Sequence, residues 1–187
     1  MPGRVAPRIV FGIDSATQPC TRDVPPSEEA SVGLPISSET EPFVVRPLVA
    51  NELERVAAVL GLARLHQGDG FYIVAWEHDE PLGHAHLALT DPPELQDVSV
   101  RREHRRRGVA SALTAVAEEE ARTRGFGRLR LTVSTDNYGA QALYRRSGYL
   151  DVGVAPKRVQ GTILIRTGPI EVDDTILTWE KRLDLRA

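Results

Sequence analysis

The segment from Leu95 to Val133 constrains the fold of this chain more than any other. It begins with a β-rich run, LQDVSV, at residues 95–100 and ends with a second one, RLRLTV, at residues 128–133. Between them, residues 108–124 carry apolar side chains at helical spacing, with a predicted buried stripe of Val109, Ala112, Leu113, Val116 and Ala117. Because parallel strands need a crossover connection of a dozen or more residues, we predict a strand–helix–strand unit with parallel strands.

The remaining elements predict a mixed α/β (α+β) domain around this unit. FVVRPL at residues 43–48 reads as a strand, and a helix with an Asn51/Glu54 capping box should follow it and end at Gly61. The runs at 71–76 and 82–89 are separated by EHDEP and predict a hairpin. A second helix is expected at 137–147, with strands at 149–154, 161–166 and 175–183.

The predicted helix at 108–124 also carries charges at helical spacing. Glu118 with Arg122 and Glu120 with Arg124 are favourable pairs four residues apart, and we expect both on the solvent-facing side.

Composition divides the chain into two parts. Residues 1–41 hold six of the 13 prolines and little apolar periodicity, so we predict a flexible Pro/Ser-rich extension, followed by one domain at 42–187. The single cysteine, Cys20, excludes an internal disulfide framework and a cysteine-rich zinc site. The short apolar run IVFGI suits neither a signal peptide nor a membrane span. We therefore expect a soluble, cytoplasmic protein without membrane partners.

Five arginines lie in RREHRRR at residues 101–107, directly before the predicted helix. The net charge of the whole chain is only -3, unlike that of a dedicated nucleic-acid binder. A strand, a short basic loop and a helix beginning at a glycine favour phosphate binding, because free backbone N–H groups and the helix dipole attract anions. Neither GxxxxGK[ST] nor a GxGxxG after a strand is present, but Arg105 to Ala110 form R-x-x-G-x-A.

A second motif lies in the predicted helix at 137–147. It has the form N-x-x-A-x-x-L-Y-x-x-x-G-Y, with its defined positions at Asn137, Ala140, Leu143, Tyr144, Gly148 and Tyr149. These two motifs, in this order and separated by a helix and a strand, resemble the GCN5-related N-acetyltransferase (GNAT) superfamily. The resemblance covers about residues 43–183. It implies a mostly antiparallel twisted sheet with a central parallel strand pair, flanked by helices.

The resemblance also implies acetyl-CoA as co-substrate, no metal, and direct transfer of an acetyl group to an amine without an acyl-enzyme. The backbone of Val98–Val100 would meet the pantetheine arm, and residues 106–111 would surround the pyrophosphate. The residues expected to bind the cofactor are Val98, Ser99, Val100, Arg105, Arg106, Arg107, Gly108, Val109, Ala110, Ser111, Asn137 and Tyr144. For Arg101, Arg102 and Arg105, phosphate contact and simple solvation are equally good interpretations.

Proton transfer requires an acid and a base. A lysine amine with an ordinary pKa near 10.4 costs about 4.6 kcal/mol to deprotonate at pH 7, whereas an α-amine costs about 1 kcal/mol. By resemblance, Tyr144 would protonate the departing thiolate. Glu94 is the first candidate for the base, because many family members carry a glutamate there that deprotonates the amine, but the base varies within the family. His84, His86 and Asp97 are alternative bases, although the ordinary interpretation of the two histidines is that of polar residues on the solvent-facing side of a sheet.

Several alternatives stay open. The domain could bind acyl-CoA as a sensor without catalysis, and RREHRRR could in principle contact nucleic acid, although it lacks interleaved aromatic residues. The acceptor could be a small amine, a polyamine or a protein amine, and a homodimer is possible. The short connection GLARLHQGDG at residues 61–70 should leave the acceptor site more open or leave its wall to another segment. The segment 155–174, with the N-terminal extension, could shape acceptor specificity or a dimer contact.

Overall fold

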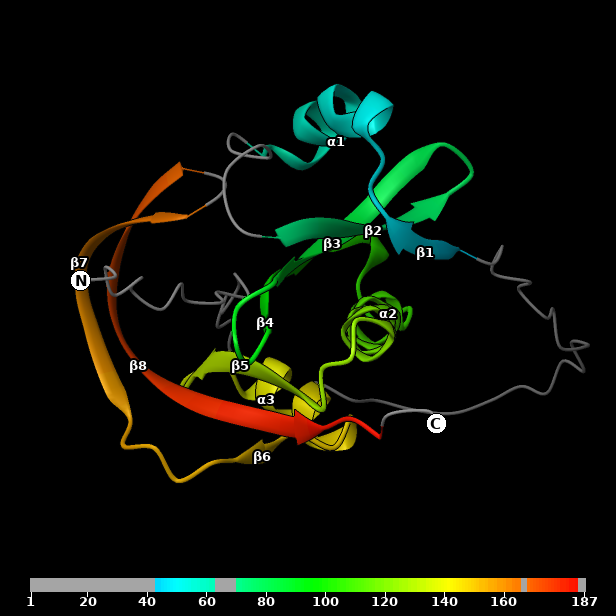
Figure 1. The fold of residues 1–187 in the computed structure, drawn as a ribbon. Helices are drawn as coiled ribbons and strands as arrows, with labels where there is room; N and C mark the ends of the chain where they lie inside the picture. Colours follow the sequence, from blue (N-terminus) through cyan, green and yellow to red (C-terminus); the bar gives the residue numbers. More distant parts are fainter. Residues whose placement is uncertain (1–42, 63–69, 166–167, 185–187) are drawn as a thin grey trace, which may run out of the picture.

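The computed structural model describes residues 43–62, 70–165 and 168–184. Eight strands form one curved sheet in the order β1-β2-β3-β4-β5-β8-β6, with β7 paired to β8 (Figure 1). The strands are β1 Val44–Pro47, β2 Gly70–Glu77, β3 Glu80–Ala88, β4 Glu94–Val100, β5 Arg128–Ser134, β6 Leu150–Asp151, β7 Lys157–Ile165 and β8 Gly168–Arg182. β4 and β5 are parallel and the other pairs are antiparallel, which confirms the predicted fold class.

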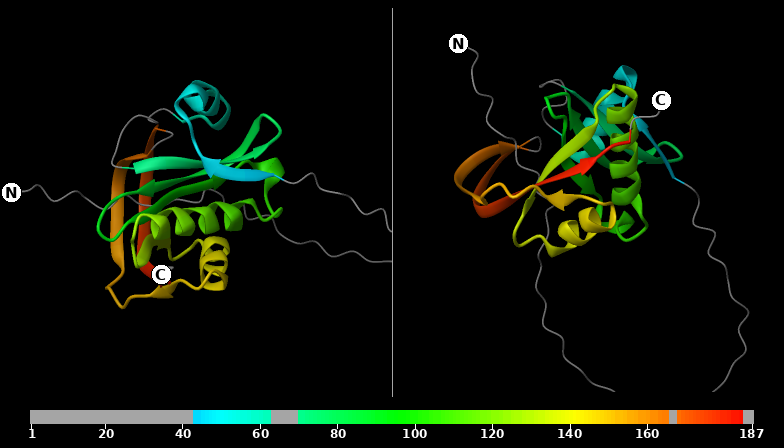
Figure 2. Two further views of the ribbon diagram at one scale, coloured as in Figure 1. Left: turned by 45° about the vertical axis from the view of Figure 1, so that its right-hand side comes forward. Right: turned by 60° about the horizontal axis from the view of Figure 1, so that its bottom comes forward.

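Helices lie on both sides of this sheet, as Figures 1 and 2 show. The described helices are α1 Leu53–Leu60, α2 Val109–Thr123 and α3 Tyr138–Arg146, with short 3-10 turns η1 Ala50–Glu52 and η2 Arg102–His104. On β2, Ile73 and Ala75 belong to the large core under α2. The alternate residues of β2, Tyr72, Val74 and Trp76, form a smaller core with Val56 of α1. The central strands are therefore covered on both faces.

The first helix begins differently from the prediction. The expected capping box at Asn51 and Glu54 is absent, because η1 precedes α1 and places Glu52 at the helix start. The Glu52 carboxylate accepts a hydrogen bond from the backbone N–H of Val49 at 3.3 Å and pairs with Arg46. Gly61 ends α1 in the left-handed conformation, as predicted.

The predicted charge pattern on α2 is right for one pair and wrong for the other. Arg124 pairs with Glu120, as expected. Glu118, expected on the solvent-facing side, is only 7% exposed, and its Oε2 accepts a hydrogen bond from Lys181 Nζ of β8 at 2.6 Å. Arg122 pairs with Glu119 instead. The surroundings of Glu118 are therefore determined by Lys181 of β8, and the helical spacing within α2 does not predict that contact.

Residues 155–174 fall largely within a long antiparallel hairpin of β7 and β8. Its ladder runs from Lys157 paired with Ile176 to Ile165 paired with Gly168, so the first strand begins four residues before the predicted GTILIR strand. The hairpin curves away from the body of the domain (Figure 1). The predicted extension at 1–41 and most of the connection at 61–70 lie outside the described residues.

Candidate functional site

The central parallel pair of strands separates after a very short ladder. β4 and β5 pair only at Glu94 with Arg130 and at Leu95 with Leu131. Farther along β4, a register shift against β3 and the positive φ of Asp97, 53°, mark a β-bulge that bends the strand. Among the described residues, no strand pairs with the β5-facing side of Val98–Val100. The backbone there can accept a ligand as an added strand.

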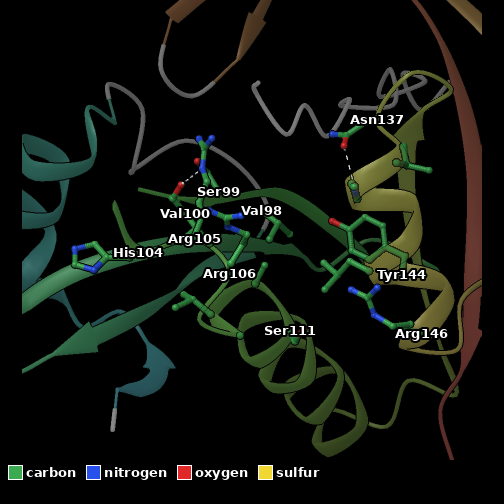
Figure 3. Close-up of a pocket in the computed structure, with 17 residues that line it drawn as sticks. Val98, Ser99, Val100, His104, Arg105, Arg106, Ser111, Asn137, Tyr144 and Arg146 are labelled. Atoms are coloured by element: carbon green, nitrogen blue, oxygen red, sulfur yellow. Dashed lines mark hydrogen bonds between the residues drawn. The ribbon is translucent and has the colours of Figure 1, made fainter. Parts of the chain in front are cut away.

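A pocket of about 580 Å³ lies where the two strands separate (Figure 3). Its walls come from the end of β4, the basic loop, the first turn of α2, the end of β5, and α3. It is lined by Val98, Ser99, Val100, His104, Arg105, Arg106, Gly108, Val109, Ala110, Ser111, Val133, Asn137, Gly139, Ala140, Leu143, Tyr144 and Arg146. All the residues predicted to bind the cofactor line this pocket except Arg107.

The N-terminus of α2 faces the pocket without a side-chain cap. Gly108 is its N-cap, with φ of 85°, and no acidic residue lies in the first turn. A Cβ on Gly108 would meet nothing within 4 Å, so within the chain the left-handed backbone, rather than crowding, requires glycine. The first helical hydrogen bond is donated by Ala112 to Gly108. The N–H groups of residues 109–111 are therefore available to an anion.

The arginines of the basic loop have different surroundings. Arg107 turns away from the pocket and pairs with Glu77 of β2, and this hydrogen bond lowers the pKa of the Glu77 carboxyl. Arg101 pairs with Glu80 and with Glu103. Arg105 lines the pocket while its Nε donates a hydrogen bond to the Val100 carbonyl at 3.0 Å, and Arg106 lines it as well. The loop therefore presents only part of its charge to the pocket.

Two polar residues of the pocket were missed by the sequence reasoning. His104 lies in η2, and its Nδ1 is 3.0 Å from an Arg107 guanidinium nitrogen. Arg146 lies near the end of α3, three residues after Leu143, so both fall on one face of that helix. The three-residue spacing from Leu143 could have predicted that Arg146 faces the pocket. We did not predict it, because the motif that ends at Tyr149 has no defined residue at position 146.

α3 positions Asn137 and Tyr144 as predicted at its start and near its end. The Asn137 Oδ1 accepts a hydrogen bond from the Ala140 N–H at 3.0 Å, which confirms the cap. Tyr144 is 2% exposed, and its ring packs edge to face against Tyr149 at 5.7 Å. Burial raises the pKa of Tyr144 well above its ordinary value. Its hydroxyl therefore stays protonated at neutral pH and can donate a hydrogen bond.

The candidate bases lie on the face of the sheet that is opposite α2. His84 and His86 are 3% and 2% exposed, so the alternative that placed them on a solvent-facing side is wrong. The His84 Nε2 lies 3.3 Å from the Asp97 Oδ2, because the bulge turns Asp97 toward that face. Glu94 is also buried, at the start of β4. The structure thus brings Asp97 and His84 together and leaves Glu94 at the start of the strand, three residues before Asp97.

Two further observations concern metals and membranes. Within residues 43–62, 70–165 and 168–184, no group of three or more His, Cys, Asp or Glu side chains could hold a metal ion. In the same residues, no helix has the length and apolar character needed to span a bilayer.

The solved structures that resemble this fold include acetyltransferases. The ribosomal-protein-S18-alanine N-acetyltransferase of Escherichia coli is 18% identical, covers 78% of this chain and 96% of its own, and gives a TM-score of 0.58. Nourseothricin acetyltransferase is 22% identical, with coverage of 76% and 99% and a TM-score of 0.57. A Bacillus anthracis protein described as a streptothricin acetyltransferase, solved with acetyl coenzyme A, is 14% identical, with coverage of 75% and 99% and a TM-score of 0.58.

At these identities the solved structures establish the fold alone. No curated protein sequence matches the chain. The sequence model of the acetyltransferase (GNAT) family matches residues 37–149, which is more than half of the chain and includes both motifs. The chain belongs to the GNAT family of acetyltransferases.

Proposed function

We propose that this protein transfers an acetyl group from acetyl-CoA directly to an amine. The observation that carries the proposal is the pocket at the separation of β4 and β5. It combines a strand edge that pairs with no strand in the described part of the chain, a helix N-terminus without a side-chain cap, and Tyr144.

The charges around the pocket suit a pyrophosphate. The N–H groups at the start of α2 can surround phosphate oxygens, and Arg105, Arg106 and Arg146 add positive charge to the rim. Val98–Val100 supply backbone groups at the spacing of a strand, which suits the two amides of a pantetheine arm. We propose that the cofactor lies along β4 with its phosphates at α2.

Tyr144 suits the leaving group. Its ring projects from α3 into the pocket between α2 and β4 (Figure 3). A phenol kept neutral by burial can donate a hydrogen bond to the thiolate as the carbon–sulfur bond breaks. The base that deprotonates the amine stays a prediction, with Glu94 as the first candidate and His84, His86 and Asp97 as the alternatives.

Two classes of acceptor are compatible with the family. The solved structures with this fold include one enzyme named for the alanine of ribosomal protein S18 and another named for nourseothricin. For this chain we propose an amine acceptor, small molecule or protein, that enters from the face of the sheet opposite α2.

Calorimetric titration with acetyl-CoA tests the proposal, with two glycine variants as a matched pair. Gly108→Glu places a carboxylate at the phosphate site, and we expect it to abolish micromolar binding. Gly125→Glu is the control, because Gly125 has a similar φ of 83° with nothing within 4 Å, and it follows the opposite end of α2. Binding that survives in the Gly108 variant, or that the parent lacks, would contradict the proposal.

Thiol release with a panel of amines separates the enzyme from the alternatives. Binding of acetyl-CoA without thiol release for any amine would favour a non-catalytic acyl-CoA sensor. A salt-dependent mobility shift with DNA or RNA would favour nucleic-acid binding. Against the latter, Arg101 and Arg107 are already paired with acidic side chains.

A further inference from the structure

We propose that His84 accepts the proton of the acceptor amine and that Asp97 is the positioning residue that orients its imidazole. This assignment rests on the proposed acetyl transfer and names a residue for the step that the resemblance leaves undecided.

The geometry of the pair selects one tautomer of His84. Its Nε2 is 3.3 Å from Asp97 Oδ2, and a carboxylate can only accept, so Nε2 carries the proton. Nδ1 then carries a lone pair. Among the described residues Nδ1 has no hydrogen-bond partner, although the His84 residue is only 3% exposed. A buried imidazole with a bare nitrogen and a carboxylate behind it is arranged as a proton acceptor.

The pair lies on β3 and β4, next to the β4 residues that line the pocket. Asp97 immediately precedes Val98, and His84 is the register partner of Ser99, and both Val98 and Ser99 line the pocket. The bulge at Asp97 makes this possible, because without the extra residue the Asp97 side chain would point to the α2 face. The proposed entry of the amine from the α1 face brings it to the side of the strand that carries His84. Because Nδ1 is buried, side chains on that face must move before the amine or a bridging water reaches it.

Glu94 is placed less favourably for the same step. It lies three residues before Asp97, which at about 3.3 Å per residue is about 10 Å along β4. At Glu94 the two parallel strands are still paired, through Arg130, so the pocket has not yet begun. The structure thus favours a base near the middle of β4, beside Asp97, over one at the beginning of the strand.

The proton and electron balance of the step is complete without another reactant. The ammonium group gives one proton to His84 Nδ1, and the neutral nitrogen attacks the thioester carbonyl. A carbon–nitrogen bond forms and the carbon–sulfur bond breaks. The thiolate takes a proton from Tyr144, which is reprotonated from solvent, while the nitrogen and His84 each release one proton. The net reaction yields the amide, the free thiol and one proton.

Other titratable groups lie on the same side of the sheet as His84 and contribute to the pH dependence of the reaction. The Tyr72 ring of β2 lies 5.9 Å from the His84 ring, and His86 is the next residue on the same face of β3. On the helix that covers this face, the Arg55 guanidinium lies over the Trp76 ring at 5.0 Å. Asp97 is the carboxylate that contacts the imidazole.

The test compares His84→Gln, His86→Gln, Glu94→Gln and Asp97→Asn with the parent. Thiol release from acetyl-CoA is measured from pH 5.5 to 9 with alaninamide, Nα-acetyl-lysinamide and spermidine as acceptors. His84→Gln should lower kcat/KM about 100-fold and remove the acid limb of the profile, as expected for loss of a general base. Asp97→Asn should show a smaller loss and keep the limb. Unchanged acetyl-CoA binding in calorimetry shows that each variant is folded.

A second measurement needs no acceptor. The ¹⁵N spectrum of the histidine side chains, with His84 assigned from its variant, should show the Nε2-protonated tautomer, and Nδ1 protonation would overturn the proposal. It is also overturned if the acid limb is lost in His86→Gln or Glu94→Gln and kept in His84→Gln. An active parent with an unchanged His84 variant removes this assignment alone. A parent that binds acetyl-CoA and releases no thiol removes the transfer function, and this assignment with it.

Discussion

The two faces of the central strands differ in what they bury. Toward α2, β3, β4 and β5 contribute apolar side chains to one core, among them Leu87, Leu95, Leu129 and Leu131. On the opposite face the same strands bury His84, His86, Glu94, Gln96 and Thr132. Apolar burial stabilises a fold, whereas polar burial costs free energy unless the groups are hydrogen-bonded. One face of these strands therefore packs the main core, and the other buries the polar side chains among which we propose the proton acceptor.

The largest effect should come from the apolar face. Leu95 is fully buried under α2, so Leu95→Ala should lower the free energy of unfolding by about 3 kcal/mol. Leu150→Ala is the control, because that side chain is 72% exposed and should contribute little. Urea denaturation measures both. A loss below about 1 kcal/mol for Leu95→Ala would show that this face tolerates cavities and would weaken the contrast between the faces.

Tyr144 breaks the pattern, because its hydroxyl is a polar group on the apolar face. Tyr144→Phe should reduce kcat about 100-fold, which corresponds to about 2.7 kcal/mol, because it removes the hydrogen bond to the leaving thiolate. Acetyl-CoA affinity and unfolding free energy should change little, since the ring still packs on Tyr149. Equal turnover of parent and variant in the thiol-release assay would assign Tyr144 to packing alone.

Alkaline pH should destabilise the apolar face through its two buried tyrosines. Burial raises the pKa of both Tyr144 and Tyr149, and the nearby Glu118 carboxylate adds to the effect at Tyr149. Above about pH 10 the unfolded chain releases these phenolic protons while the folded chain retains them. The free energy of unfolding should therefore fall by up to about 1.4 kcal/mol per pH unit for each tyrosine.

Denaturation between pH 9 and pH 11.5 measures this slope in three variants. Tyr149→Phe should remove part of the slope, and Tyr144→Phe should remove a similar part. Tyr138→Phe serves as the control, because that side chain is 74% exposed. Identical slopes in all three variants would mean that the alkaline loss arises elsewhere.

The smallest effect should come from the polar face and should have the opposite sign. Thr132 is 4% exposed, and its hydroxyl has no hydrogen-bond partner among the described residues. Thr132→Val keeps the shape and removes the unpaired hydroxyl, so it should stabilise the fold by up to about 1 kcal/mol. Thr114→Val is the matched comparison, since the Thr114 hydroxyl donates to the Ala110 carbonyl at 2.9 Å and its loss should destabilise the fold. Destabilisation by both changes would indicate that Thr132 is hydrogen-bonded in solution.

Much of the fold could be predicted because it depends on local patterns. The helical spacing predicted α2, and Asn137 predicted the start of α3. Of the predicted buried stripe, Val109, Leu113 and Ala117 are buried, whereas Ala112 and Val116 are only half-buried. The local pattern gave a wrong prediction where a residue is contacted by another element. Glu118 was expected to face solvent, but it pairs with Lys181, which is 63 residues away. The predicted cap at Asn51 failed because Glu52, one residue later, is engaged by both Val49 and Arg46.

By itself, the sequence determined the parallel strand–helix–strand unit, the uncapped helix start at Gly108 and the helix that carries Tyr144. These features follow from periodicity and from the backbone preferences of single residues, which act over a few positions. Only the tertiary structure decided which arginines face the pocket and that Asp97 contacts His84, 13 residues away. Strand register and a single bulge bring that pair together, and neither can be read from local spacing because both are set by contacts between strands.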